Sequence, residues 1–121
     1  MKEVSSVIEY KGKEYKIVFN LNVMQEIQEE YGSLREWGEK TDGKNEKGEP
    51  DGEPDVKALI FGMTTMLNEG IDIENDENGT RIPPFTKKQV GRILTDVGIQ
   101  KMTDDMNELV IASTKSDEKN A

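Results

Sequence analysis

The stretch that decides the start of the fold is Tyr10-Lys11-Gly12-Lys13-Glu14-Tyr15-Lys16-Ile17-Val18-Phe19-Asn20. The turn Lys11-Gly12-Lys13 separates two runs in which apolar residues alternate with charged or smaller ones, a pattern that predicts a β-hairpin over residues 4–19. Because successive side chains of a strand point to opposite faces, Tyr15, Ile17 and Phe19 share one face, which we expect to be the core face.

Helix signals follow the hairpin directly. Asn20 can cap a first helix that runs to about Tyr31, and Gly32 suits a left-handed position just after its end. Next, Ser33 and Glu36 match a capping box, which opens a short helical turn that carries Trp37. The hairpin is therefore predicted to lead straight into helical structure.

Three further helices are predicted in the second half of the chain. The most apolar one begins at Pro54-Asp55 and runs to about Asn68, with Gly70 as its stop. A capping box of Thr86 and Gln89 opens the next helix, over residues 87–97. The acids after Thr103 favour a last helix over residues 103–113.

Polar segments separate these helices. Residues 38–54 contain no large apolar residue and are predicted to form a flexible loop, and residues 71–85 form a second long polar loop. The end of the chain, 115–121, is predicted to be a disordered tail. The prediction is thus a single domain over residues 1–114 of the α+β class, mainly α, with an N-terminal hairpin, about four helices and two long polar loops.

The residue types present exclude most enzyme chemistry. The sequence has no histidine and no cysteine, so Ser–His and Cys–His nucleophiles, disulfides and His-ligated metal sites cannot form. Most acids fall in the predicted loops, where a catalytic carboxylate pair would not be held rigidly. Around Gly79, a calcium loop would require a glutamate where Phe85 stands, so an acidic turn is the preferred interpretation. We expect neither enzyme activity nor a cofactor.

Charge and hydropathy exclude several kinds of binding partner. The 121 residues include 16 basic and 25 acidic ones, which gives a formal charge of −9. Nucleic acids and anionic membranes attract basic surfaces, so neither is an expected partner. The longest apolar run, 58–63, is too short to cross a bilayer, and the start Met1-Lys2-Glu3-Val4 lacks the apolar region of a signal peptide. We expect a cytoplasmic protein.

The six methionines are the remaining unusual feature. Flexible thioether side chains can line an adaptable groove for apolar segments of a partner, although ordinary core filling is the alternative for each of them. Trp37 has the same two interpretations, as a contact or as a core residue. The predicted helices 55–68, 87–97 and 103–113 could supply such a groove. The candidate partner-binding residues are Trp37, Leu59, Met63, Met66, Leu67, Ile93, Met102, Met106 and Leu109.

Three segments of the chain carry a resemblance to a known family. They are the hairpin and first helix (Tyr10–Asn20, then Glu26-Ile27-Gln28-Glu29-Glu30-Tyr31-Gly32), the mid-chain helix Pro54-Asp55-Val56-Lys57-Ala58-Leu59-Ile60-Phe61-Gly62-Met63, and Phe85-Thr86-Lys87-Lys88-Gln89-Val90-Gly91-Arg92-Ile93-Leu94-Thr95-Asp96-Val97-Gly98. Together they cover 42 of the 121 residues, about a third of the chain. In this order they resemble the tail assembly chaperones of long-tailed phages and prophages of Gram-positive bacteria.

The resemblance implies a mostly helical, self-associating protein of the bacterial host cytoplasm. Its implied partner is the tape-measure protein, which such chaperones coat and keep soluble before the tail tube polymerises. Two other functions stay open. A structural virion component, such as a tail or head–tail connector protein, would persist in purified particles. An acidic regulatory or DNA-mimic protein would bind a basic nucleic-acid-binding protein in a salt-sensitive way.

Overall fold

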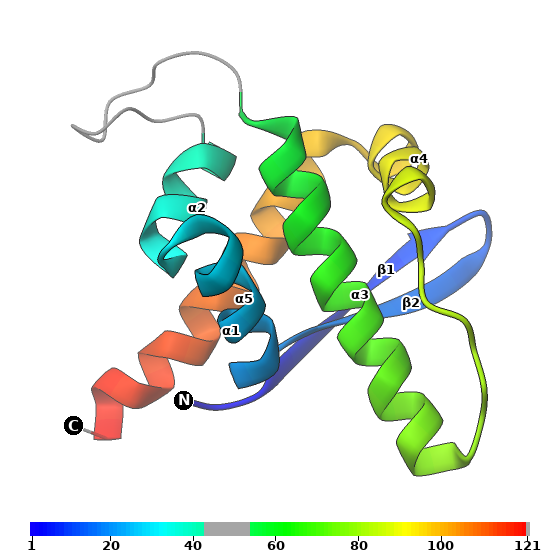
Figure 1. Cartoon of the computed structure of the whole chain (residues 1–121), viewed down its shortest axis with the longest axis horizontal. Helices are drawn as coiled ribbons and strands as arrows, with labels where there is room; N and C mark the ends of the chain where they lie inside the picture. Colours follow the sequence, from blue (N-terminus) through cyan, green and yellow to red (C-terminus); the bar gives the residue numbers. More distant parts are fainter. Residues whose placement is uncertain (43–53, 121) are drawn as a thin grey trace.

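The computed structural model describes residues 1–42 and 54–120, with side chains as far as Thr114. A two-stranded hairpin opens the chain and helices make up the rest of the described part, which confirms the predicted α+β, mainly α class (Figure 1). The elements are β1 (Val4–Tyr10), β2 (Lys13–Phe19), α1 (Leu21–Tyr31), α2 (Leu34–Asp42), α3 (Val56–Asn78), α4 (Lys87–Val97) and α5 (Ile99–Asn120).

The hairpin is antiparallel, and its register runs from Val4 opposite Phe19 to Tyr10 opposite Lys13. Its turn consists of Lys11 and Gly12, both with positive φ (51° and 75°), as a type I′ turn requires. Ile17 and Phe19 are buried on the predicted core face, and Tyr15 beside them is half-buried.

The predicted Asn20 cap and the Thr86–Gln89 capping box are confirmed, and of the box predicted at Ser33 the bond from the Glu36 amide to the Ser33 hydroxyl is present. The Asn20 side chain accepts a hydrogen bond from the Val23 amide, and Thr86 and Gln89 form both bonds of a capping box. α3 begins at Val56 and not at the predicted Pro54-Asp55, because Asp55 is its N-cap and accepts from the amides of Lys57 and Ala58. These polar side chains satisfy amides that have no partner inside the helix, which fixes where each helix begins.

Helix α3 is longer than predicted and corrects the second loop. Gly70 does not end it: the helix continues to Asn78, and Gly79 in the left-handed conformation provides the C-cap. Gly70 is instead a packing residue, because a Cβ there would lie 2.7 Å from the carbonyl oxygen of Lys16 on β2. The absent side chain lets the helix approach the strand, and the connection to α4 shortens to residues 79–86.

Three other predicted boundaries are wrong. α2 continues to Asp42, so residues 38–42 are helical; the rest of the predicted loop, 43–53, lies outside the described residues. α5 begins at Ile99, so Thr103 lies inside the helix, where its hydroxyl donates to the Ile99 carbonyl one turn earlier and does not cap a helix start. The backbone of α5 also runs helically to Asn120, past the predicted helix end at 113, and the disorder predicted for residues 115–121 stays a prediction.

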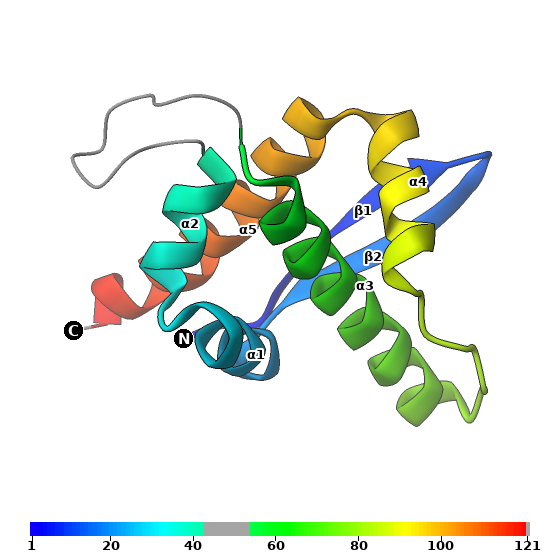
Figure 2. The same cartoon turned by 45° about the horizontal axis from the view of Figure 1, so that its top comes forward.

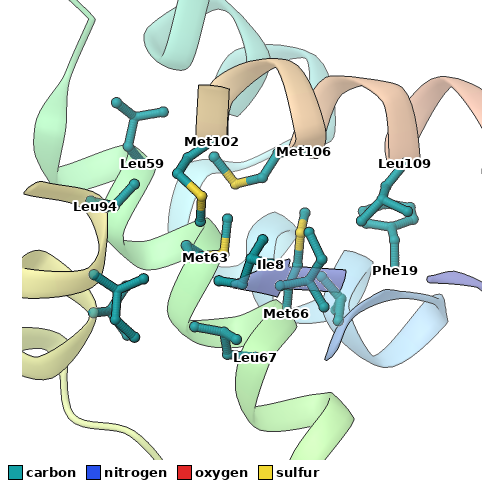
Figure 3. Close-up of a cluster of buried hydrophobic side chains, with 14 of the residues drawn as sticks. Ile8, Phe19, Leu59, Met63, Met66, Leu67, Leu94, Met102, Met106 and Leu109 are labelled. Atoms are coloured by element: carbon teal, nitrogen blue, oxygen red, sulfur yellow. The ribbon is translucent and has the colours of Figure 1, made fainter. Parts of the chain in front are cut away.

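One hydrophobic core joins the hairpin to the helices. α3 crosses the hairpin, with α4 beside the hairpin's turn end and α5 on the other side of α3 (Figures 1 and 2). In Figure 3, the methionine side chains of α5 point toward those of α3, with Ile8 of β1 next to them. The two ends of the chain thus share a core with its middle.

Candidate protein-binding groove

The nine predicted partner-binding residues are brought together, but inside the protein. All of them belong to the core cluster and are at most 5% exposed: Trp37, Leu59, Met63, Met66, Leu67, Ile93, Met102, Met106 and Leu109. Figure 3 labels seven of them, all except Trp37 and Ile93. Leu59 and Leu67 border the open hollows described below, whereas the other seven are covered by neighbouring elements and would be reached by a partner after the helices separate. In this conformation they pack as core residues, and their role in partner binding stays a prediction.

Trp37 is held in the core by contacts with α3. Its indole Nε1 donates a hydrogen bond to the carbonyl oxygen of Ala58 at 3.0 Å, and its ring lies directly against Gly62. A Cβ on Gly62 would overlap the ring, so the glycine creates the space that the tryptophan fills. Trp37 consequently fastens α2 to α3.

An open surface with apolar side chains lies elsewhere, in a hollow of about 790 Å³ that we call the β2–α3 groove. Residues 13–16 of β2 form one side of this groove, and the second half of α3 from Leu67 to Asn78 forms the other. The connection to α4 closes the end with Ile82, Pro83, Pro84, Phe85 and Thr86, together with Gln89. A volume of this size is in the range of established ligand pockets.

Two asparagines of α3 hold the connection that forms part of the groove. Asn68 donates to the carbonyl of Phe85 at 3.1 Å and accepts from its N–H at 2.8 Å. Asn75 makes the same pair of bonds with Ile82, at 3.0 and 2.9 Å. Between these two positions the chain is Pro83-Pro84, whose φ angles are fixed by their rings. The wall of the groove is therefore preformed.

Apolar side chains line much of the groove. Ile71 and Ile73 of α3 are half-buried there, and Ile82 is 39% exposed. The ring of Phe85 meets that of Tyr15 edge to face, with centroids 5.3 Å apart, which ties the connection to β2. A partner that covered these side chains would remove apolar surface from water, the main source of affinity in most protein complexes.

Charges of both signs surround the apolar lining. Glu74 and Glu77 stand on the α3 side, and Lys13 and Lys16 on the β2 side. Ion pairs in the described part of the chain involve other residues, namely Arg35–Glu39 and Lys101–Asp105. The two glutamates of the groove therefore have no basic partner among residues 1–42 and 54–114.

A smaller hollow of about 360 Å³ lies between α3, α4 and the start of α5. Its lining includes Leu59 and Ile60, and Val56 and Ile99 on its border are 50% and 42% exposed. This hollow lies between the three helices that were expected to supply a groove, and of the predicted residues it includes Leu59 alone. It is a second apolar surface, less than half the volume of the first.

The groove residues were missed by the sequence reasoning, with the exception of Leu67. Ile71, Ile73, Ile82 and Phe85 all fall within the segment that was predicted to be a polar loop. Isoleucines are unusual in a solvated loop, and this signal could have identified the segment as structured.

Tyr31 lines neither hollow but has an altered acidity. Burial raises the pKa of its hydroxyl above the ordinary value, and the carboxylates of Asp55 and Glu30 raise it further. The hydroxyl is buried without a hydrogen-bond partner in the described part of the chain, and the ring packs edge to face on Phe61.

The acidic residues and the helices in the part of the chain that the structure describes bear on metal binding and on membrane insertion. Glu74, Asp76 and Asn78 lie on α3 and not in a calcium-binding loop, and no group of three acidic side chains there could hold a metal ion. No helix of that part has the length and apolar character needed to cross a membrane.

Comparison with protein-family models, curated proteins and solved structures finds no match for this chain.

Proposed function

We propose that this chain is a protein-binding module whose β2–α3 groove holds an apolar segment of another protein. The observation that carries the proposal is the open apolar lining of Ile71, Ile73 and Ile82 in a preformed hollow of about 790 Å³. The acidic exterior of a chain with a formal charge of −9 favours the solubility of a complex.

The resemblance to tail assembly chaperones supplies a specific partner for this proposal. A tape-measure protein is a long chain with apolar stretches that aggregate when exposed. The chaperone would cover such stretches in the cytoplasm of the bacterial host until the tail tube encloses them. The groove supports this role because it offers apolar contact without requiring any catalytic group.

Co-expression with the tape-measure candidate, the large protein expected to be encoded next downstream, tests the proposal. We expect the large protein to be soluble with the native chain and insoluble without it. The variant Ile82→Arg, which places a charge in the groove at a partly exposed position, should lose the effect. Ile111→Arg is the matched control, because Ile111 is 60% exposed and lines neither hollow.

Equal insolubility of the large protein with and without the native chain would contradict the chaperone role. Purified phage particles give a second readout, because a chaperone should be absent from them. Stoichiometric presence of this chain in the particles would favour a structural virion component instead.

A further inference from the structure

The edge of β2 lies inside the β2–α3 groove. Four consecutive residues, Lys13 to Lys16, line this hollow. Side chains of neighbouring strand residues point to opposite faces, so a single face of β2 would contribute only alternate residues. Consecutive lining residues therefore indicate that the groove runs along the backbone edge of the strand.

The register of the hairpin shows which backbone groups point into the groove. Tyr10 and Lys13 flank a two-residue turn and form a hydrogen-bonded pair. Bonded and non-bonded pairs alternate along an antiparallel ladder, so the N–H and C=O groups of Glu14 and Lys16 point away from β1. The closeness of Gly70 to the Lys16 carbonyl agrees with this direction.

Three of these outward groups are available to a partner. Gly70 of α3 covers the Lys16 carbonyl, but the N–H and C=O of Glu14 and the N–H of Lys16 have no hydrogen-bond partner within the described ranges 1–42 and 54–120. Unpaired groups on a sheet edge are a template for another strand. Natural sheets usually block such an edge, whereas here it lies next to apolar side chains.

We infer that the groove takes an extended segment of the partner protein as a third strand on β2. This inference rests on the proposed function and deepens it, because it states how the partner binds. The covered Lys16 carbonyl limits pairing to a short stretch opposite Lys13–Lys16. A bound helix would satisfy its own backbone groups internally and leave those of Glu14 unpaired.

The lining also specifies the side chains of that segment. Ile71, Ile73 and Ile82 favour apolar residues at alternate positions, because one face of the added strand turns toward them. Glu74 and Glu77, which lack basic partners among the described residues, favour a lysine or arginine on the side nearest α3. The ligand is thus an extended, alternating apolar segment with at least one basic residue.

Replacing Glu14 by proline tests the backbone contact. Glu14→Pro removes an N–H that the β1–β2 ladder does not use, and proline is tolerated at such edge positions. Glu14→Ala removes the side chain but keeps the N–H, and serves as the control. The probe is a set of overlapping 15-residue peptides that cover the large protein encoded next downstream, and affinity is measured by fluorescence anisotropy. We expect about tenfold weaker binding for Glu14→Pro and a change within about twofold for Glu14→Ala.

A second measurement does not depend on how the variant folds. The tightest peptide is methylated at one backbone nitrogen at a time and bound to the native chain. Strand addition predicts that every second methyl group weakens binding, since only alternate amides face β2. Uniform loss, or loss with a helical period, overturns the inference, as does native affinity of Glu14→Pro.

Failure of the inference is distinguishable from failure of the proposed function. If no peptide binds while the intact large protein is still solubilised, strand addition is overturned and the chaperone role stands. If no peptide binds and the intact large protein also stays insoluble, both strand addition and the chaperone role are overturned. Self-association of the native chain that Glu14→Pro abolishes would show that a second copy occupies the edge, which overturns the partner segment as its ligand.

Discussion

The side-chain amide of Asn75 binds the backbone of Ile82 as a neighbouring strand would, donating at 3.0 Å and accepting at 2.9 Å. Asn68 binds Phe85 in the same way seven residues earlier on α3. Seven helical residues advance about 10.5 Å and three extended residues cover about 10 Å, so the two pairs fit without distortion. This match lays the connection along the helix and gives the groove a fixed wall.

Removing one of these amides should loosen the wall. Asn68→Ala leaves the part-buried N–H and C=O of Phe85 without partners, so we expect a loss of about 1–3 kcal/mol in the free energy of unfolding. Urea denaturation of the native chain and of Asn68→Ala measures this loss. The control Gln25→Ala removes an exposed side chain of α1 and should cost less than about 0.5 kcal/mol. Equal stability of the two variants would contradict the proposed holding role of Asn68.

Two glycine substitutions should change the stability of the fold in opposite directions. Gly62→Ala forces a methyl group into the Trp37 ring, and overpacking of this kind costs about 1–3 kcal/mol. Gly38→Ala on α2 meets nothing within 4 Å and should stabilise the helix by about 0.4–1 kcal/mol. Thermal unfolding of both variants checks the pair, and a stabilised Gly62→Ala would show that the indole can move away.

The hairpin turn offers a stabilising change. Lys11 adopts φ 51°, which costs an ordinary L-residue about 1–2 kcal/mol, whereas asparagine accepts this conformation readily. Lys11→Asn also loses the ammonium group 5.4 Å from the Tyr10 ring, a contact worth about 0.5 kcal/mol at an exposed site. We therefore expect a net gain of about 0.5 kcal/mol and a higher melting temperature. A lower melting temperature for Lys11→Asn than for the native chain would contradict the type I′ assignment of the turn.

Alkaline pH should destabilise the protein through Tyr31. Because its pKa is raised in the folded state, folding retains a proton that the unfolded chain loses above about pH 10. The contribution of this group is complete below that pH and is lost as the pH rises through the folded-state pKa. Tyr31→Phe removes the titrating group and the unpaired hydroxyl. In denaturation experiments the free energy of unfolding of this variant should therefore fall less than that of the native chain between pH 9 and about pH 11. Parallel pH profiles for both proteins would refute this.

Local signals in the sequence predicted much of this fold. The Lys11-Gly12 turn, the Asn20 cap and the Thr86–Gln89 box depend on neighbouring residues, and all of them appear in the structure. Gly70 was misread because its role depends on β2, some fifty positions earlier in the chain. A glycine that ends a helix and a glycine that admits a strand have the same appearance in a sequence.

The candidate site was less predictable for the same reason. The amphipathic stripes correctly identified apolar helix faces, but a stripe does not show whether another element covers it. Here α5 and the hairpin cover the methionines of α3, and the open surface is formed where α3 extends past Gly70. That extension was itself mispredicted, so Ile71 and Ile73 were assigned to a loop.

Nuclear magnetic resonance of isoleucine and methionine methyl groups, with and without the large downstream protein, tests the central claim most directly. Binding in the β2–α3 groove predicts that the methyl signals of Ile71, Ile73 and Ile82 shift or broaden while those of Met63 and Met102 stay in place. The opposite pattern, with the core methionines perturbed and the groove isoleucines unchanged, would show that the helices open to bind and would contradict this account.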